Sequence, residues 1–298
     1  MCQALPGKER VNLPWSNRKK AAVAAGGAGI AALLYSIAVE PYHIEHVEIE
    51  LQLPRLPEEF DGYRVLQISD LHMRKMGRRE KLLQSILRKL PSHDLALITG
   101  DLIHTPGGAA HFITLSRSIV ATDGVYAVFG NSEHKNGVRS KEFAKQLGKA
   151  GITALINSST IINRGGSRIY LLGVDDPVSQ KEDLRAAISG VPDEAFKLLM
   201  MHSPDPIGQA SAYGIDLVLS GHTHGGQVRI PGIGALHTNT VLGLSMDSGL
   251  FKEQRLFDII GFRAGRTQLY VSRGVGSSGF ALRFMCPPEI TSITLKRI

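Results

Sequence analysis

Residue types that could do chemistry gather directly after five apolar segments of the sequence. They are Asp70 and His72, Asp101, Asn131, His202, and His222 and His224. Aspartate, asparagine and histidine offer oxygen and nitrogen ligands that suit divalent ions such as Mn, Fe or Zn. These seven groups are more than one four-coordinate zinc ion needs. If one carboxylate bridges, they fit two ions about 3.5–4 Å apart, which lower the pKa of a bridging water for attack on a phosphoryl group.

Each of these clusters stands at the end of a predicted buried strand. The five apolar runs are residues 64–68, 95–99, 125–129, 196–201 and 216–220. Further strands are predicted over 46–53, 169–174, 268–273 and 290–296, and helices over 79–90, 141–150 and 181–189. This alternation predicts one α/β domain over residues 44–298. Sites in open α/β sheets form at the carboxyl ends of strands, so we expect the clusters to meet in space.

No single cluster is decisive. An Asp-x-His pair is common by chance, Gly100-Asp101 is a usual turn sequence, and a lone His202 more often has a structural role. Residues 221–226, Gly-His-Thr-His-Gly-Gly, are more specific, because two histidines at i and i+2 can address two different ions. All five clusters in order, each at a predicted strand end, indicate a dinuclear metal centre.

The complete series resembles the motif set of the calcineurin-like metallophosphoesterase superfamily. The match covers about residues 60–298, and residues 225–227 and 283–290 are similar to the bacterial membrane-associated branch of phosphodiesterases. The resemblance implies a four-layer α/β/β/α sandwich with two ions. It assigns one ion to Asp70, His72 and His224 and the other to Asn131, His202 and His222, with Asp101 as the bridging ligand.

One position departs from the pattern of that family. The family usually places a histidine directly after the asparagine, where it protonates the leaving group, but this chain has Ser132 there. His134 is our candidate for the missing general acid, and the alternative is that it is a surface-loop histidine. Because of Ser132, the alternative function is a metal- or phosphate-binding module that has lost turnover.

The first forty residues form a separate part of the chain. Residues 1–20 include a short basic tail, and residues 21–39 carry no charge. At about 1.5 Å per helical residue, this run is just long enough to cross a hydrocarbon core of about 30 Å. It lacks a polar face, so we expect a transmembrane segment rather than a buried amphipathic helix. We favour an uncleaved signal anchor; the alternatives are a cleaved signal peptide and a twin-arginine-type export signal.

The charges around this run predict its orientation. Basic residues precede it, and glutamates follow it at positions 40, 45, 48 and 50. The positive-inside rule places the N-terminus in the cytoplasm of a bacterial cell and the catalytic domain outside the cell membrane. The alternatives are export after signal cleavage and a position on the cytoplasmic face. Cys2 would lie apart from Cys286, so we expect no disulfide between them.

The formal net charge of +7 is mainly a topology signal. Residues 1–39 hold five basic groups and one acid, a net charge of +4, which leaves +3 for residues 40–298. The sequence shows neither a basic patch with interleaved aromatic residues nor a helix-turn-helix signature, so no specific nucleic-acid binding is expected.

The predicted function is a metal-dependent phosphoesterase, either a phosphodiesterase or a pyrophosphatase. The expected cofactors are two divalent ions, and the expected substrate is a phosphate ester. A membrane anchor favours a lipid-linked substrate, and some enzymes of the resembling superfamily cleave the pyrophosphate of UDP-2,3-diacylglucosamine. That reaction is cytoplasmic, which conflicts with the predicted orientation.

A run of basic residues follows the first ligand motif. It either contacts the phosphate of the substrate or forms a solvated helix face, and it consists of Arg74, Lys75, Arg78 and Arg79.

Overall fold

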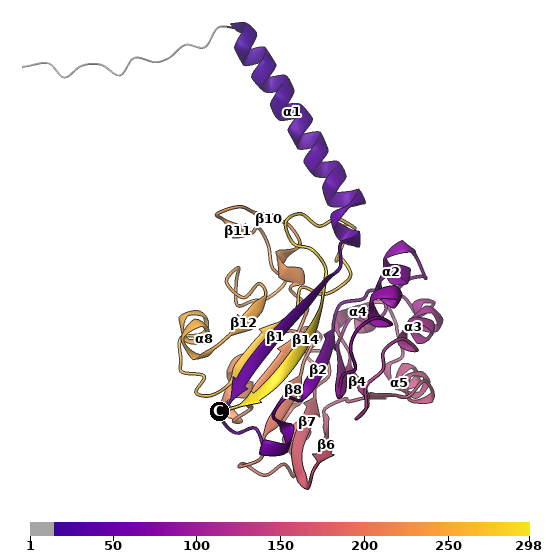
Figure 1. The fold of residues 1–298 in the computed structure, drawn as a ribbon, viewed down its shortest axis with the longest axis vertical. Coiled ribbons are helices and arrows are strands. Elements are labelled where there is room, and N and C mark those ends of the chain that lie inside the picture. Colours follow the sequence, from indigo (N-terminus) through magenta and orange to yellow (C-terminus); the bar gives the residue numbers. More distant parts are fainter. Residues whose placement is uncertain (1–14) are drawn as a thin grey trace, which may run out of the picture.

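Two six-stranded sheets stack face to face at the centre of the molecule (Figure 1). The computed structural model describes residues 15–298. The first sheet has the strand order β1 (Glu45–Leu53), β14 (Glu289–Arg297), β2 (Arg64–Ile68), β3 (Leu95–Thr99), β4 (Val125–Val128) and β5 (Ile152–Ala154). The second has the order β12 (Gly249–Phe251), β13 (Gln268–Val271), β9 (Leu217–Ser220), β8 (Lys197–Met200), β7 (Ser167–Gly173) and β6 (Ser158–Arg164). A separate hairpin pairs β10 (Arg229–Ile230) with β11 (Gly234–Ala235).

The strands that lead to the predicted ligands are parallel within each sheet. β2, β3, β4 and β5 run parallel to one another, as do β7, β8, β9 and β13. β14 is antiparallel to β2 and parallel to β1, so the last strand of the chain joins the first strand to the sheet. All nine predicted strands are present, and the carboxyl ends of the parallel strands lie at a common end of each sheet.

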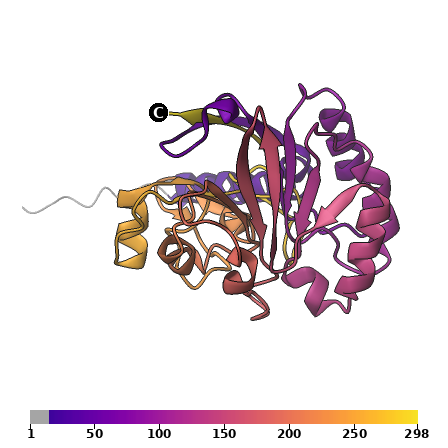
Figure 2. The same ribbon diagram turned by 90° about the horizontal axis from the view of Figure 1, so that it is seen from below.

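Helices cover the outer faces of both sheets, which Figure 2 shows from below. The first sheet packs against α2 (Arg78–Leu87), α3 (Gly108–Ser116) and α5 (Ser140–Lys149). The second packs against α6 (Leu184–Ile188), α7 (Ile207–Ala212) and α8 (Glu253–Ile260). Short helical segments complete the chain: η1 (Glu40–Tyr42), η2 (Glu58–Phe60), α4 (Asn131–Lys135) and η3 (His224–Gly226). The helix predicted over 181–189 begins later, at Leu184, because the side chain of Asp183 accepts a hydrogen bond from the N–H of Ala186 and caps it.

Three hydrophobic clusters separate the layers. One lies between the sheets and includes Val65, Leu97, Leu198 and Leu217, all fully buried. The other two lie between each sheet and its helices. The order of helix, sheet, sheet and helix confirms the predicted α/β/β/α sandwich.

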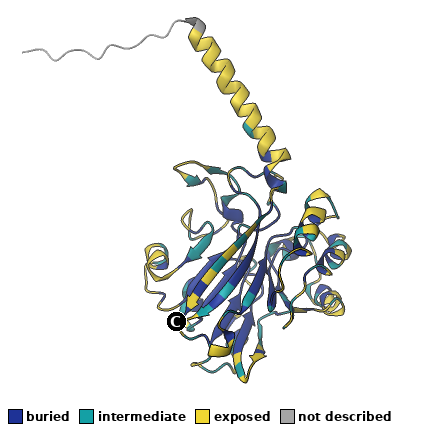
Figure 3. Ribbon diagram, in the orientation of Figure 1, coloured by how far each residue is buried: buried dark blue, intermediate teal, exposed yellow. Residues whose placement is uncertain are grey.

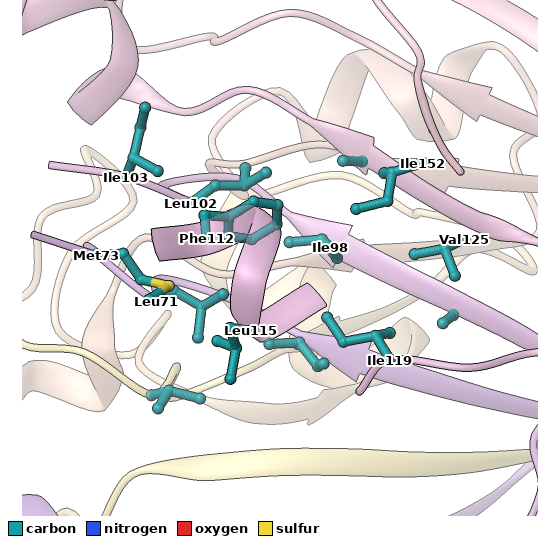
Figure 4. Close-up of a cluster of buried hydrophobic side chains, with 14 of the residues drawn as sticks. Leu71, Met73, Ile98, Leu102, Ile103, Phe112, Leu115, Ile119, Val125 and Ile152 are labelled. Atoms are coloured by element: carbon teal, nitrogen blue, oxygen red, sulfur yellow. The ribbon is translucent and has the colours of Figure 1, made fainter. Parts of the chain in front are cut away.

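The cluster under α3 also holds the segments that carry ligands (Figure 4). Leu71 and Met73 flank His72, and they pack in this cluster with Phe112 and Leu115 of α3. Burial of such side chains stabilises by about 1.5–3 kcal/mol each. The ligand positions are therefore interleaved with core residues, which fixes the backbone between them.

One long helix, α1 (Trp15–Ala38), projects from the domain and is exposed along nearly all of its length (Figure 3). It is long and apolar enough to cross a membrane, although a signal sequence would have the same character. Its exposure excludes a buried core helix. Residues 1–14, which include most of the predicted basic tail and Cys2, lie outside the described residues, and Cys286 is buried and free.

Candidate metal centre

The loops that follow strands of both sheets meet at one end of the sandwich. β2, β3 and β4 of the first sheet and β8 and β9 of the second lead directly into the predicted ligands. The structure brings all seven together: Asp70, His72, Asp101, Asn131, His202, His222 and His224. Asn131 and His72 are half-buried and the other five are buried.

One oxygen of Asp101 lies between two groups of ligands. Its Oδ2 atom is 3.3 Å from Nε2 of His72 and 3.4 Å from Nε2 of His202. The same Nε2 atom of His202 is 3.1 Å from Nδ1 of His222 and 3.2 Å from Oδ1 of Asn131. We call the group formed by Asn131, His202 and His222 the Asn131 side of the cluster.

The Asp70 side consists of Asp70, His72 and His224. Nε2 of His72 is 3.2 Å from Nε2 of His224, which is 3.5 Å from Oδ1 of Asp70. Atoms that bind one ion at about 2.1 Å lie roughly 3–3.5 Å apart. The separations on both sides of Asp101 therefore fit divalent ions with oxygen and nitrogen ligands.

Backbone carbonyls fix the rings of the Asn131 side. Nδ1 of His202 donates to the carbonyl oxygen of Thr99 at 2.9 Å, and Nε2 of His222 donates to that of Asn239 at 3.0 Å. Each ring therefore directs its other nitrogen into the cluster, as partners of this kind do for metal-binding histidines. Neither carbonyl was identified from the sequence, because only the tertiary fold brings it to the ring.

Five of the ligands have left-handed backbone conformations, which are unusual for residues with a side chain. The φ angles are 53° at Asp70, 46° at His72, 52° at Asp101, 71° at His222 and 53° at His224. Such angles cost roughly 1–3 kcal/mol each and persist where the surrounding structure enforces them, often at functional sites. The sharp turns at the strand ends thus point several side chains at one place.

Glycines leave room for the carboxylates at two close approaches. A Cβ atom on Gly130 would lie 2.3 Å from Oδ1 of Asp101, and one on Gly221 would lie 2.3 Å from Oδ2 of Asp70. A larger side chain at either position would displace the carboxylate. Steric space therefore explains why glycine stands at the first position of the Gly-Asn and Gly-His motifs, which the sequence pattern alone only suggested.

The protonation of the cluster follows from its burial and its carboxylates. Burial lowers the pKa of His72 to about 4 and holds the pKa of His224 well below its usual value, so both rings are neutral at neutral pH, the form that binds metals. Burial also acts to lower the pKa of His202, but the charge of Asp101 outweighs it and raises that pKa to about 10. Burial acts to raise the pKa of Asp101, and the charges of His202 and His72 outweigh it and hold the pKa well below its usual range. Without an ion, His202 therefore carries a proton beside Asp101, and an ion on the Asn131 side would displace that proton.

Comparison with known proteins agrees with this geometry. A family model described as calcineurin-like phosphoesterase matches residues 63–226. The chain is also 33% identical over 281 residues to the uncharacterized metallophosphoesterase YkuE of Bacillus subtilis (strain 168), across 93% of this chain and 92% of that protein. The chain belongs to the calcineurin-like phosphoesterase family. It is therefore a phosphoester hydrolase by family.

Two further relatives extend the comparison. The chain is 28% identical over 239 residues to the phosphodiesterase YaeI of Escherichia coli (strain K12), across 78% of this chain and 82% of that protein. It is 29% identical over 271 residues to a transmembrane protein with metallophosphoesterase domain of Danio rerio, across 84% of this chain and 57% of that protein.

This calcineurin-like phosphoesterase uses Ser132 and Glu133 to build the loop around Asp101. The main-chain N–H of Ser132 donates to Oδ1 of Asp101 at 2.7 Å, while its hydroxyl donates to the carbonyl oxygen of Ile103. Glu133, which the sequence analysis missed, accepts hydrogen bonds from the N–H groups of Gly130 and Ile103. A glutamate three residues into a helix start is a capping-box signal that could have revealed this role.

His134 lies on α4 and has partners at both ring nitrogens. Nε2 donates to Oδ1 of Asp175 at 2.7 Å, and Nδ1 accepts a hydrogen bond from Nζ of Lys181 at 3.0 Å. A carboxylate therefore orients the ring, as it often does for catalytic histidines. Both of these hydrogen-bond partners lie outside the set of seven ligands.

Arg283 is a fully buried residue beside the Asp70 side that the sequence analysis also missed. Its Nη2 atom lies 3.5 Å from Nδ1 of His224, and burial lowers its pKa to about 10, so it stays charged at neutral pH. Its main-chain N–H donates to the carbonyl oxygen of Ser36 in α1. The guanidinium donates to four main-chain carbonyl oxygens, those of Arg273, Gly274, Gly276 and Cys286.

A cavity of about 620 Å³ opens beside His72. His104 lies in its wall, with its ring centroid 6.0 Å from that of His72. The predicted basic run also lies in the wall: Arg74, Lys75, Arg78 and Arg79. Glu80, a buried carboxylate that pairs with Arg79, also lines the cavity. The remaining lining residues are Pro41 and Tyr42, which follow α1, together with Gly77, Ser277, Gly279 and Ala281.

Proposed function

We propose that this phosphoester hydrolase is a phosphodiesterase or pyrophosphatase with a dinuclear metal centre. The observation that carries the proposal is the position of Asp101, whose Oδ2 atom lies within 3.4 Å of one histidine from each side of the cluster. The proposed ligands are Asp70, His72 and His224 for one ion and Asn131, His202 and His222 for the other, with Asp101 shared. When bound, two divalent ions would supply positive charge to the phosphoryl oxygens and lower the pKa of a coordinated water. The oxygen and nitrogen ligands suit Mn, Fe or Zn.

The chain's own cations are suited to orient a phosphate in the cavity. Arg74, Lys75 and Arg78 are exposed within its wall, next to the ligand His72. Guanidinium groups bind phosphate oxygens in pairs, and such charge-assisted bonds are roughly twice as strong as neutral ones. We therefore assign these residues to substrate binding rather than to a solvated helix face.

His134 is the proposed general acid. Asp175 holds its ring as an orienting carboxylate would, although release of the proton requires the ring to leave one of its partners. His104 is the second candidate, because it lines the cavity beside His72. We expect His134→Ala to lower kcat by about 10²–10⁴-fold on an alkyl phosphodiester and much less on a nitrophenyl ester, whose leaving group needs little acid help. If His134→Ala kept wild-type turnover and His104→Ala lost it, His104 rather than His134 would be the general acid.

The cavity also supports a lipid-linked substrate. Pro41 and Tyr42 immediately follow α1, so a bilayer around that helix would lie close to the cavity mouth. A phosphodiester or pyrophosphate that is attached to acyl chains could then enter without leaving the membrane. UDP-2,3-diacylglucosamine is one compound of this class and serves as a test substrate beside ordinary phospholipids.

Contacts at the end of α1 support an uncleaved anchor. Ser36 is 3% exposed, and its carbonyl oxygen accepts the N–H of Arg283 at 2.9 Å. Cleavage near residue 38 would remove this buried contact. The basic residues that precede residue 21, three of them in the first turns of α1, favour an N-terminus in the cytoplasm and a domain outside the cell. A C-terminal reporter that is active only outside the cytoplasm should be active; a reporter active only in the cytoplasm would reverse the orientation.

The function is tested with the purified full chain in detergent micelles. We expect Mn²⁺ to stimulate hydrolysis of bis-nitrophenyl phosphate and Asp101→Asn to abolish that stimulation. Asp216→Asn is the matched control, because Asp216 is equally buried but lies before β9, where it pairs with Arg266. Metal binding without hydrolysis in the wild-type chain would instead establish the non-catalytic binding module that Ser132 suggested.

A further inference from the structure

Exposed apolar side chains gather on two segments beside the base of α1. Ile233 and Leu236, in and after the β10–β11 hairpin, are 71% and 51% exposed. Phe280 and Met285, in the loop before β14, are 82% and 51% exposed. We call the segments 229–236 and 277–285 the rim. Side chains of this size and exposure on one surface indicate a partner that buries apolar groups.

Hydrogen bonds join the two parts of the rim to each other. The N–H of Arg229 donates to the carbonyl oxygen of Phe284 at 2.9 Å, and Val228 forms a bridge with the same residue. The side chain of Gln227 donates to the carbonyl oxygen of Phe280 at 3.1 Å. The hairpin and the loop are therefore joined into one surface.

The rim is also bonded to the end of α1. The carboxylate of Glu40, itself 2% exposed, accepts the N–H groups of Met285 and Cys286. Arg283 donates its main-chain N–H to Ser36 in the last turns of the helix. These bonds fix the level of the rim relative to α1. Figure 1 shows the hairpin and the base of α1 at the same end of the domain, opposite the C-terminus.

The position of α1 selects a lipid bilayer as the partner. The proposed anchor ends at Ala38, so the membrane surface lies at the level of Ser36 and Glu40, where the rim is attached. Segments that lie in the interface of a bilayer typically combine exposed apolar side chains with nearby cations. Exposed cations of this kind, Arg74, Lys75 and Arg78, line the cavity together with Gly279 and Ala281 of the rim.

We propose that the rim is a second membrane contact, which inserts Ile233, Leu236 and Phe280 into the head-group region beside α1. This inference rests on the proposed anchoring role of α1. With the rim inserted, the mouth of the cavity faces the lipid head groups and the ligand cluster lies behind it.

Tryptophan fluorescence of the full chain tests this contact. The only tryptophan of the sequence is Trp15, so Trp15→Phe provides a silent background for single reporters. Phe280→Trp and Ile233→Trp place reporters on the rim, and Leu33→Trp in α1 is the positive control. Val120→Trp is the matched negative control: Val120 is 73% exposed but precedes β4, at the end of the first sheet opposite the ligands. The vesicles contain phosphatidylcholine and phosphatidylglycerol in equal parts, with or without bromine near the head group.

We expect brominated lipid to quench both rim reporters to within about twofold of Leu33→Trp, and to leave Val120→Trp unquenched. Flotation of the vesicles is measured on the same samples. Rim reporters that are quenched no more than Val120→Trp, in protein that floats with the vesicles, would overturn the rim contact and leave the anchor intact. Protein that does not float would overturn the anchor and the rim contact together. Neither outcome depends on hydrolysis, so this experiment is independent of the test of the metal centre.

Discussion

The two sides of the ligand cluster hold their histidines differently. On the Asn131 side, the outer nitrogens of His202 and His222 donate to the carbonyl oxygens of Thr99 and Asn239. On the Asp70 side, Nδ1 of His72 is buried without a hydrogen-bond partner within the described residues. The second ring on that side faces a cation, because Nδ1 of His224 lies 3.5 Å from the guanidinium of Arg283.

This difference in outer partners predicts a difference in ion affinity between the two sides. Outer hydrogen bonds to metal-binding histidines fix the ring and increase its basicity, and their loss typically weakens metal affinity about 10–100-fold. On the Asn131 side both rings donate an outer hydrogen bond to a carbonyl oxygen. On the Asp70 side His72 has no outer partner among the described residues, and His224 has only the long contact with the cation of Arg283. We therefore expect the Asn131 side to bind its ion more tightly, and the Asp70 side to exchange its ion more readily.

The largest effect is expected where the two sides meet. Asp101→Asn keeps the shape of the shared ligand but removes its charge, so we expect kcat to fall by about 10³-fold or more and both ions to be lost, a larger loss than outer partners cause. Mn²⁺-dependent hydrolysis and metal analysis measure this. Loss of only one ion in Asp101→Asn would show that the carboxylate serves a single side.

Variants of one side each separate the two affinities. Calorimetric titration of the chelator-treated chain with Mn²⁺ should show two binding steps, at least about tenfold apart in affinity. His202→Ala should remove the tighter step, and His72→Ala the weaker one. The reverse pattern would show that the outer carbonyls do not control affinity.

The smallest effects are expected from two glycines that border different sides. A Cβ atom on Gly130 would lie 2.3 Å from Oδ1 of Asp101, and one on Gly276 would lie 2.4 Å from the carbonyl oxygen of Asp70. We expect Gly130→Ala to weaken the tighter Mn²⁺ step about tenfold and Gly276→Ala to weaken the other step by a similar factor.

Gly148→Ala is the control for these glycine variants. A Cβ atom there meets nothing within 4 Å, and the position is in α5, so the substitution should raise stability by about 0.5–1 kcal/mol and leave both binding steps unchanged. Equal effects of all three variants on metal binding would point to a general loss of stability, which thermal unfolding would reveal.

The buried strands and the ligand types were predictable from the sequence because each signal is local. β2 and β3 are short, largely apolar runs, each followed two residues later by an aspartate, and the structure matches their predicted bounds. α3 was missed, since its sequence begins with Gly-Ala-Ala and contains β-branched residues. Its Phe112 and Leu115 are fully buried against the first sheet, so packing rather than local propensity forms this helix.

The supporting residues of the site could not be predicted in the same way. Arg283 begins the stretch 283–290 that resembles the bacterial membrane-associated branch, but that resemblance assigns it no role, and only the fold brings it within 3.5 Å of the ring of His224. The carbonyl of Asn239 acts through the main chain, so its side-chain type carries no signal. The edge strand β6 was also missed, because only Ile162 among its residues is buried and the strand lacks a clear period.

The number of ions per chain tests the central claim most directly. The full chain, saturated with Mn²⁺ and freed of excess ion, is analysed for metal beside His72→Ala and His222→Ala. We predict two ions in the wild-type chain and one in each variant, with hydrolysis lost in both. A wild-type chain that holds a single ion, lost in both variants, would contradict a centre in which Asp101 joins two sides.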